Sequence, residues 1–318
     1  MTMNQGVLSG VFLDTETLSL ATLDTTALKA LDVELRCYKS SCADEVVSRI
    51  KDASFILVNK VNLNRDVLQH AKALKYIGVT ATGINNIDTE YCAQQNICVR
   101  NVTAYGTESV AQHTLMLLLN LVTNFPRYHN DVQQGNWSSS EHFCLNQYPV
   151  TTLSGKHAVV VGHGELGQRV DALFNAFGMR VSIAARPGKE NDDRPTLDSL
   201  LPTADVVSLH CPLTKDNEKL INARTLALMK PSAVLINTAR GGLVDEAALL
   251  RALKLNKLGG AALDVISEEP PSPEHIFMSN PMPNLLISPH NAWIAQSARQ
   301  HLLDKTVSQL QEFLASQS

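Results

Sequence analysis

Two patterns of apolar residues alternate along the chain. Short runs of β-branched and aliphatic residues recur between longer segments in which apolar residues return every three or four positions. The first pattern is typical of buried strands, and the second of helices that cover one face of a sheet. Strands and helices that alternate in this way predict parallel sheets with helices on both faces.

The clearest alternation runs from residue 157 to residue 287. The predicted strands are His157–Val161, Arg180–Ala184, Asp205–Leu209, Ala233–Asn237, Gly260–Leu263 and Asn284–Ile287. The predicted helices are Leu166–Phe177, Asn222–Met229 and Glu246–Leu255, the last of them capped by Asp245. In the first helix Leu166, Val170, Leu173, Phe174 and Phe177 share one stripe.

A weaker alternation fills the first hundred residues. Its strands are predicted near Leu8–Phe12, Val33–Cys37, Phe55–Val58, Tyr76–Gly78 and Ile97–Val99. Linkers are predicted near Asn101–Tyr105 and Pro289–Asn291, and a last helix over Ala292–Ala315. We therefore expect residues 1–103 and 291–318 to form a discontinuous outer domain, with a dinucleotide-binding domain, residues 104–290, inserted between them. The resulting hinged cleft is where ligands are expected.

The helix predicted over residues 107–121 is apolar on almost every side. A surface helix would show a polar face. The helix is therefore expected either between the two domains or in the interface of a homodimer.

Composition narrows the class of protein. Hydrophobic residues make up 44% and charged residues 18% of the 318 residues, and the net charge is −4. This excludes a general attraction to nucleic acid or to anionic membranes. No membrane-spanning run and no signal peptide in Met1–Gly10 is recognisable, and the six cysteines form no CxxC pair. Reduced thiols in the cytoplasm and no metal site are expected.

Gly162-His163-Gly164-Glu165-Leu166-Gly167 is a GxGxxG sequence. It follows a predicted strand directly and opens a predicted helix, which is the context that a dinucleotide-binding loop requires. Gly162 permits the tight turn, Gly164 lets the pyrophosphate approach the backbone, and Gly167 allows close helix–strand packing. The helix N-terminus then faces the anion.

The end of the second strand bears on the choice of cofactor. NAD-specific sites place an acid there to bind the ribose 2′-hydroxyl, but this chain has Ala185 followed by Arg186, Pro187, Gly188 and Lys189. No carboxylate repels a 2′-phosphate, and Arg186 is able to pair with one. NADP(H) is therefore expected over NAD(H). The alternative is that Arg186 is a solvated loop residue and both cofactors are accepted.

Four polar residues follow three predicted strands of the same domain. Arg240 follows Ala233–Asn237, Asp264 closes Gly260–Leu263 with Glu269 shortly after it, and His290 follows the last strand. Taken singly, an Arg after a strand, a His after Pro or a Glu before Pro is more often a structural or solvated loop residue. Together they suit reduction of a 2-keto acid, which needs a cation for the carboxylate, a proton donor and an acid that orients the donor.

These residues carry a resemblance to a known family. The chain resembles the D-isomer-specific 2-hydroxyacid dehydrogenases, and among them the glycerate dehydrogenase/hydroxypyruvate reductase branch. The segments that carry the resemblance are Asn101–Ala111, Gly162–Gly167, His210–Thr214, Leu228–Pro231, Asn237–Val244, Asp264–Pro270 and Pro289–His290. The resemblance implies two doubly wound parallel-sheet domains, with a Rossmann-type cofactor domain inserted into a flavodoxin-like substrate domain, and a homodimer.

It also implies roles for individual residues. Arg240 would bind the substrate carboxylate, His290 would act as acid/base, and Glu269 would be its partner, favouring the imidazolium. The residues implied to bind the cofactor are Thr107, Gly162, Gly164, Glu165, Leu166, Gly167, Ala185, Arg186, Pro187, His210, Cys211, Pro212, Thr238, Ala239, Arg240 and Asp264. Asp264 would hold the nicotinamide carboxamide. Ala81, Thr82 and Gly83 would bind the substrate carboxylate from the outer domain, with Lys60 a weaker candidate.

The family leaves the substrate open. Hydroxypyruvate and glyoxylate are expected first, and pyruvate, a bulkier keto acid or a phosphoglycerate is the alternative. Two branches of the family are less expected. Formate dehydrogenase relatives carry Gln in place of Glu269, and the longer phosphoglycerate dehydrogenases have a further C-terminal domain. A cofactor-sensing binding protein, resembling the C-terminal-binding corepressors, is the alternative from another class. Trp137 and Trp293 are each expected either to shape specificity or to lie in a core.

Overall fold

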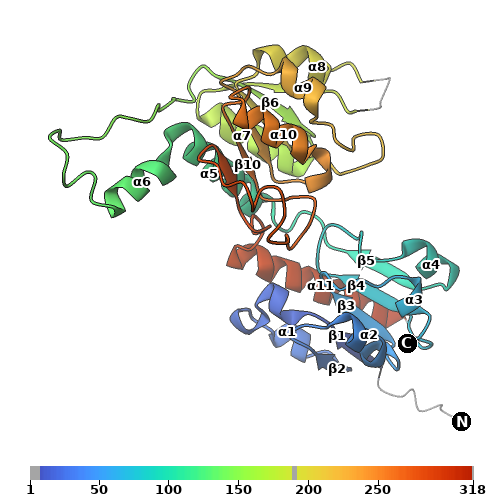
Figure 1. The fold of residues 1–318 in the computed structure, drawn as a ribbon. Coiled ribbons are helices and arrows are strands. Elements are labelled where there is room, and N and C mark those ends of the chain that lie inside the picture. Colours follow the sequence, from blue (N-terminus) through green and yellow to red (C-terminus); the bar gives the residue numbers. More distant parts are fainter. Residues whose placement is uncertain (1–7, 188–191, 317–318) are drawn as a thin grey trace, which may run out of the picture. The chain divides into compact units, whose positions relative to one another are not determined.

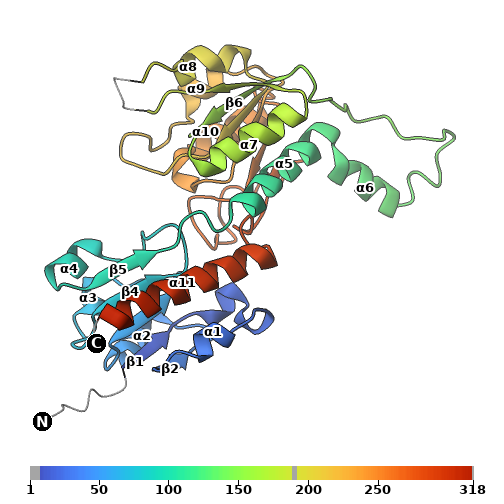
Figure 2. The ribbon, with the colours of Figure 1, turned by 180° about the vertical axis from the view of Figure 1, so that it is seen from behind.

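The computed structural model describes residues 8–187 and 192–316, which divide into two units. Unit 1 comprises Met1–Gly106 and Ile294–Ser318, and unit 2 comprises Thr107–Trp293. The beginning of the segment tested above for a signal peptide, and also Gly188 and Lys189 of the loop after the second strand, lie outside the described residues. Figures 1 and 2 show the elements of both units from opposite sides.

Unit 1 is built on a five-stranded sheet in the order β2-β1-β3-β4-β5. Its strands are β1 (Ser9–Phe12), β2 (Glu34–Cys37), β3 (Phe55–Val58), β4 (Tyr76–Val79) and β5 (Cys98–Asn101). Its helices are α1 (Thr26–Lys29), α2 (Ala43–Ile50), α3 (Arg65–Leu68), α4 (Thr89–Gln94) and α11 (Gln296–Ser316), with short 3₁₀ turns η1 (Thr15–Leu18) and η2 (Leu20–Thr22). All neighbouring strands are parallel, and the strand order is the flavodoxin-like one.

The central strands of unit 1, β1, β3 and β4, are buried on both faces of the sheet. On one face, Ile56 and Ile77 pack with apolar residues of α2, α3 and α4. The other face is covered by α1 and α11 (Figure 2), and Tyr76 of β4 stacks on Phe313 of α11 with ring centroids 4.7 Å apart. The last helix of the chain therefore packs on the sheet that the first hundred residues form.

Unit 2 is built on a six-stranded sheet in the order β11-β10-β9-β8-β6-β7, again with all neighbours parallel. Its strands are β6 (His157–Val161), β7 (Arg180–Ile183), β8 (Val206–Leu209), β9 (Val234–Asn237), β10 (Gly260–Leu263) and β11 (Leu285–Ile287). Its helices are α5 (Thr107–Thr123), α6 (Phe125–Gln133), α7 (Glu165–Ala176), α8 (Leu197–Leu200), α9 (Ala223–Leu228) and α10 (Glu246–Lys254), with 3₁₀ turns η3 (Leu201–Thr203) and η4 (Gly241–Leu243).

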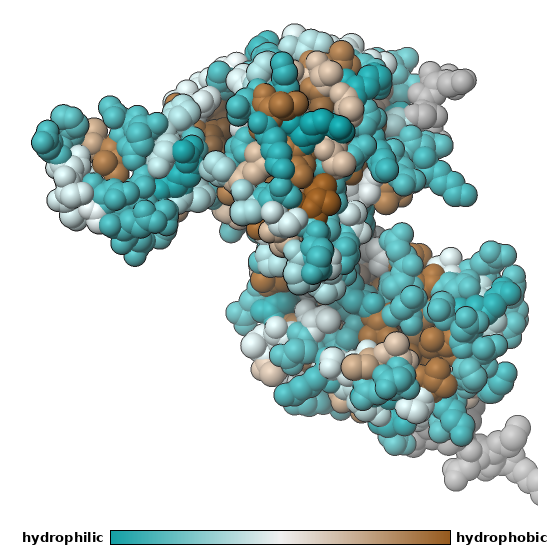
Figure 3. Space-filling view, viewed as in Figure 1, coloured by the Kyte–Doolittle hydropathy of each residue, from teal (hydrophilic) through white to brown (hydrophobic). Residues whose placement is uncertain are grey.

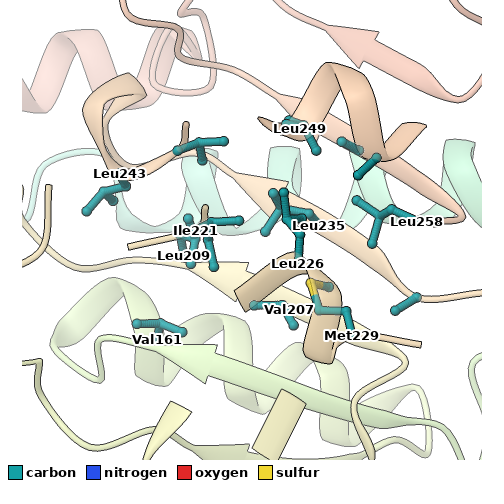
Figure 4. Packing of buried hydrophobic residues seen from close by; sticks show 14 of the residues in the cluster. Val161, Val207, Leu209, Ile221, Leu226, Met229, Leu235, Leu243, Leu249 and Leu258 are labelled. Atoms are coloured by element: carbon teal, nitrogen blue, oxygen red, sulfur yellow. The ribbon is translucent and has the colours of Figure 1, made fainter. Parts of the chain in front are cut away.

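The side-chain alternation of the strands divides the core of unit 2 into two layers. Ala158 and Val160 of β6 pack with α5 and α7, whereas Val159 and Val161 pack with the layer below α8, α9 and α10. Figure 4 shows the second layer, in which leucines of β9, α9 and α10 fill the space above the sheet. Together the units confirm the predicted fold class of two parallel-sheet α/β domains.

Some predicted boundaries differ for identifiable reasons. α11 begins at Gln296, because the amides of Asn291 and Ala292 donate to the Asp264 carboxylate and belong to a loop. Phe177 caps the end of α7 and is 42% exposed, so it does not share the buried stripe. A helix not expected from the sequence, α6, and the loop after it extend away from the rest of unit 2 (Figure 1).

Three further features of the structure concern membrane spans, metal sites and cysteines. Within residues 8–187 and 192–316, no helix combines the length and hydropathy needed to cross a membrane. In the same residues no group of His, Cys, Asp and Glu is arranged to hold a metal ion. All six cysteines are free thiols.

Candidate active site

The GxGxxG loop has the geometry that a dinucleotide loop needs. Gly162 has φ +94°, and a Cβ there would lie 2.6 Å from the Cys211 amide nitrogen. Only glycine fits this turn. A Cβ on Gly164 would meet no atom within 4 Å, so space is open at the N-cap of the twelve-residue helix α7. These residues fit a pyrophosphate held at a helix N-terminus.

Neighbouring elements extend this site along the ends of the strands. The Thr107 hydroxyl donates to Glu165 Oε1 at 2.7 Å, which ties the first residues of α5 and α7 together. After β8, Cys211 is buried and Pro212 is exposed. His210 Nε2 lies 2.8 Å from Ser208 Oγ, and its buried Nδ1 has no hydrogen-bond partner among the described residues. Burial lowers the pKa of His210 to about 3, so the ring is neutral near pH 7.

A cluster of charges not anticipated from the sequence lies beyond β7. Ala185 is held by a hydrogen bond from its amide to Pro195 O, and Arg186 donates to Asp192 from its amide (2.9 Å) and its Nε (3.1 Å). Arg194 also donates to the Asp192 carboxylate, and these hydrogen bonds, together with those from Arg186, hold the pKa of Asp192 far below its usual range. The Arg186 side chain is nevertheless 64% exposed.

The Arg240 loop is shaped by the asparagine that ends β9. The Asn237 side chain accepts from the Ala239 amide (3.0 Å) and donates to Arg240 O (2.8 Å), which folds the chain back at the strand end. Thr238 is buried against Thr114 of α5, their hydroxyls 3.1 Å apart. Arg240, partly exposed, donates from Nη1 to Ala239 O at 2.6 Å.

The next residue joins this loop to the one that carries Glu269. Gly241 packs so closely on the Ile266–Ser267 peptide that a Cβ would lie 2.0 Å from Ile266 O. Glu246, at the start of α10, accepts from the Ser267 amide and hydroxyl at 2.7 Å each. Glu269 accepts from the Ile266 amide at 3.0 Å. These contacts fix the Glu269 carboxylate relative to Arg240.

His290 and Glu269 form a close pair of ionisable side chains. His290 Nδ1 lies 2.6 Å from Glu269 Oε2, and their side chains are 29% and 34% exposed. His290 has φ +51°, a left-handed conformation that residues with a Cβ rarely adopt. Trp293 donates from Nε1 to His290 O at 3.0 Å. The arrangement presents an imidazole whose tautomer and direction are set by a carboxylate, as general acid/base catalysis requires.

Asp264 directly follows β10 and is 2% exposed. Its carboxylate accepts from the Ser288 hydroxyl (2.6 Å) and the amides of Asn291 (3.0 Å) and Ala292 (2.9 Å). Burial alone would raise the pKa of Asp264, but hydrogen bonds from His113, Ser288 and the two amides hold it below its usual range. The carboxylate is thus turned toward the His290 loop, and its contact with a nicotinamide carboxamide stays a prediction.

The substrate residues expected in the outer domain lie at strand ends of unit 1. Lys60 follows β3, and buried Asp14 accepts from its amide at 2.6 Å and from the Asn59 amide at 2.8 Å. Burial raises the pKa of Asp14 in spite of these hydrogen bonds. Ala81, Thr82 and Gly83 follow β4, the neighbour of β3, with Ala81 buried and Thr82 exposed. Both groups therefore lie at the same edge of this sheet.

Sequence patterns did not identify every residue that positions the site. Asp192, Glu246 and His113 went unrecognised, because their contacts join segments far apart in the chain or cross a loop. A signal existed only for Asp192, a carboxylate shortly after the strand end at which an acid was sought. Trp137 is 51% exposed and donates from Nε1 to Phe143 O, so it is not part of the core of the chain.

Residues 115–292 match the family model described as the NAD binding domain of D-isomer specific 2-hydroxyacid dehydrogenases. A glycerate dehydrogenase of Methylorubrum extorquens is 38% identical over 306 residues and a hydroxypyruvate reductase of Blautia hydrogenotrophica 35% over 314, each match covering 96% of both chains. An NADPH-dependent glyoxylate/hydroxypyruvate reductase of Sinorhizobium meliloti, solved with NADP and malonate, superimposes with TM-score 0.80 at 27% identity, over 96% of this chain and 93% of that one. A D-lactate dehydrogenase of Aquifex aeolicus, solved with NAD and lactic acid, gives TM-score 0.82 at 29% identity, over 97% and 96%.

Proposed function

Since the chain belongs to the D-isomer-specific 2-hydroxyacid dehydrogenase family, we propose that it reduces hydroxypyruvate and glyoxylate, with His290 as its acid/base. It is an NAD(P)-dependent oxidoreductase. The observation that carries the proposal is the 2.6 Å contact between His290 Nδ1 and Glu269 Oε2. The loop that contains Glu269 also packs against the turn that contains Arg240. The names of the glycerate dehydrogenase and hydroxypyruvate reductase relatives support the choice of substrate.

The proposed mechanism assigns one task to each residue. The nicotinamide cofactor, when bound, supplies or accepts the hydride at substrate C2. His290 delivers a proton from Nε2 to the carbonyl oxygen, while Glu269 accepts from Nδ1 and stabilises the imidazolium that precedes the transfer. Arg240 pairs with the substrate carboxylate. The amides of Ala81, Thr82 and Gly83 bind the same carboxylate, with Lys60 as a further cation.

Residues of unit 2 are proposed to hold the cofactor. The pyrophosphate binds at Gly164, Glu165, Leu166 and Gly167, where α7 begins. Thr107, His210, Cys211 and Pro212 would contact the dinucleotide, and Thr238, Ala239, Arg240 and Asp264 would hold the nicotinamide. Ala185, Arg186 and Pro187 face the adenosine ribose.

We propose NADP(H) as the preferred cofactor. The end of β7 carries Ala185 in place of a carboxylate. Asp192 engages the amide and Nε of Arg186 and, as far as the described residues go, leaves the other end of this exposed guanidinium for a 2′-phosphate. Arg186, Arg194 and Asp192 together carry one net positive charge. The NADP complex of the Sinorhizobium meliloti relative is consistent with this preference, and the NAD complex of the Aquifex aeolicus enzyme marks the alternative.

We also propose a homodimer through α5, α6 and the loop after α6. Large apolar residues are exposed there, among them Phe125 (57%), Trp137 (51%) and Phe143 (91%). In Figure 3 hydrophobic residues lie among polar ones on the segment formed by α6 and the loop after it. A second copy of the chain would bury them, which is a common reason for exposed apolar surface.

A reducing compartment, the cytoplasm, suits the free thiols.

Turnover tests the proposed reaction. Oxidation of NADPH and NADH is followed at 340 nm with hydroxypyruvate, glyoxylate and pyruvate. His290→Ala should lower kcat by about 10²–10⁴-fold, the usual effect of losing a positioned acid/base, and leave cofactor binding unchanged. His70→Ala, at an exposed histidine of unit 1, is the control. Full activity of His290→Ala would remove this residue from the role, and no turnover with any pair would favour a binding protein.

A second comparison tests the cofactor preference. Arg186→Ala should raise KM for NADPH and leave KM for NADH unchanged. Arg224→Ala is a matched control, because Arg224 is also 64% exposed and pairs with an aspartate, Asp198, on the surface. A preference for NADH in the unaltered protein, with no effect of Arg186→Ala, would contradict the NADP(H) proposal but leave the dehydrogenase assignment intact.

A further inference from the structure

One face of α5 forms hydrogen bonds to the loop that carries His290, both before and after this residue in the sequence. Ser109 and His113 are one helical turn apart, so their side chains lie on the same face of the helix. The Ser109 hydroxyl donates to Ala292 O at 2.6 Å. His113 Nε2 lies 2.9 Å from Ser288 Oγ. His290 stands between Ser288 and Ala292, so the helix is tied to the loop before and after it.

The hydrogen bonds between these residues have a defined direction. Ionised Asp264 only accepts, and the Ser288 hydroxyl lies 2.6 Å from its Oδ1, so Ser288 gives its single proton to Asp264. Ser288 Oγ can then only accept from His113, whose Nε2 therefore carries a proton. His113 Nε2 is also 3.4 Å from Asp264 Oδ1, and its side chain is 15% exposed. A relay of donors runs from His113 through Ser288 to Asp264.

The relay ends on the backbone of the catalytic loop. Asp264 Oδ2 accepts from the Ala292 amide at 2.9 Å. The backbone carbonyl of Asp264 accepts from the His290 amide, also at 2.9 Å. His290 has φ +51°, which is unfavourable for a residue with a Cβ. Such a conformation persists only where the surrounding contacts determine it. Asp264 and its donors supply those contacts.

We propose that His113 and Ser288 are positioning residues that, through Asp264, hold the His290 imidazole in line with Glu269 and the substrate carbonyl. This rests on the proposed role of His290 as acid/base. The two residues do not touch the reacting atoms. They act on the rate because a misplacement of about 1 Å in a catalytic group costs about 10²-fold in turnover. Because Asp264, which is also proposed to contact the nicotinamide, keeps the donors from the Asn291 and Ala292 amides, the effect of His113 and Ser288 on cofactor binding is expected to be smaller than that on kcat.

Substitutions at His113 separate a donor from a space-filling ring. His113→Phe keeps the ring and removes the donor, and His113→Gln keeps an amide donor on a chain of similar reach. We expect His113→Phe to lower kcat by at least about 10-fold, with a smaller change in KM for the nicotinamide cofactor, and His113→Gln to recover most of the loss in kcat. Thr123→Val is the control, because that hydroxyl donates within α5, to Leu119 O.

Ser288→Ala gives an independent route if His113→Phe does not fold. It removes the middle of the relay and should lower kcat to a similar extent. In the double variant His113→Phe/Ser288→Ala the losses should not multiply, because the second substitution breaks a relay already broken. Circular dichroism melting curves establish that each variant is folded at the assay temperature.

The outcomes distinguish this inference from the proposed function. Wild-type kcat in His113→Phe or Ser288→Ala, with inactive His290→Ala, would overturn the relay and leave the acid/base role standing. Multiplying losses in the double variant, or no recovery in His113→Gln, would also overturn it. Full activity of His290→Ala would instead refute the proposed function. A kcat loss restored by His113→Gln and not multiplied by Ser288→Ala establishes the relay.

Discussion

Gly241→Ala probes the contact that joins the Arg240 turn to the Glu269 loop. A Cβ at position 241 would lie 2.0 Å from Ile266 O and 2.6 Å from the Ser267 nitrogen, and Cβ contacts under 3.0 Å are essentially never formed. Both neighbours are backbone atoms, so the two segments must separate by about 1 Å. Arg240 is carried on one side of the contact and Glu269 on the other.

The size of the effect follows from that displacement. A shift of about 1 Å between catalytic groups costs about 10²-fold in rate, so kcat/KM for hydroxypyruvate should fall by about 10²-fold. Overpacking of this kind also destabilises by about 1–3 kcal/mol, so the assay is run well below the melting temperature of the variant. Activity is measured from nicotinamide oxidation at 340 nm, and folding from circular dichroism.

The next residue supplies the control. A Cβ at Gly242 would lie 2.7 Å from Leu213 Cδ2, the end of a side chain that is 39% exposed and free to turn away. Gly242→Ala should therefore change kcat/KM by no more than about 2-fold. The reasoning fails if folded Gly241→Ala keeps wild-type kcat/KM, or if Gly242→Ala loses as much activity.

Three further predictions concern stability. Burial lowers the pKa of His210 from 6.5 to about 3, so below pH 7 the unfolded chain binds a proton at this residue that the folded chain does not bind. The free energy of unfolding should therefore drop by at most about 2 kcal/mol between pH 7 and pH 5, and by less where water reaches the ring. His210→Gln should remove this part of the pH dependence measured by urea denaturation. Phe174→Ala removes a fully buried ring of α7 and should lower the free energy of unfolding by about 3–5 kcal/mol in urea titrations; a loss under 1 kcal/mol would mean that the layer collapses into the gap. Asp245→Ala removes the cap that accepts from the Ala248 amide and should lower the urea midpoint by the equivalent of about 1 kcal/mol, whereas Asp245→Asn should not.

Much of the fold follows from the sequence alone. Every strand of both sheets falls within a residue or two of its predicted range. The apolar signal is strongest for strands such as β3 and β6, because a strand that is buried on both faces is apolar at successive positions. The placement of Arg240, Asp264 and His290 at one edge of a sheet is equally local in origin. Parallel strands end at the same edge, so residues that follow them in the sequence meet in space.

Contacts between distant segments were decided by the tertiary structure. His113 and Ser288 are 175 residues apart, and nothing in the apolar pattern of α5 distinguishes the histidine that reaches the loop carrying His290. The inward direction of the Asp264 carboxylate, the pairing of Arg186 with Asp192 and the approach of Gly241 to Ile266 are of the same kind. Periodicity records which face of an element is buried, but which partner a buried polar group finds depends on how the elements pack.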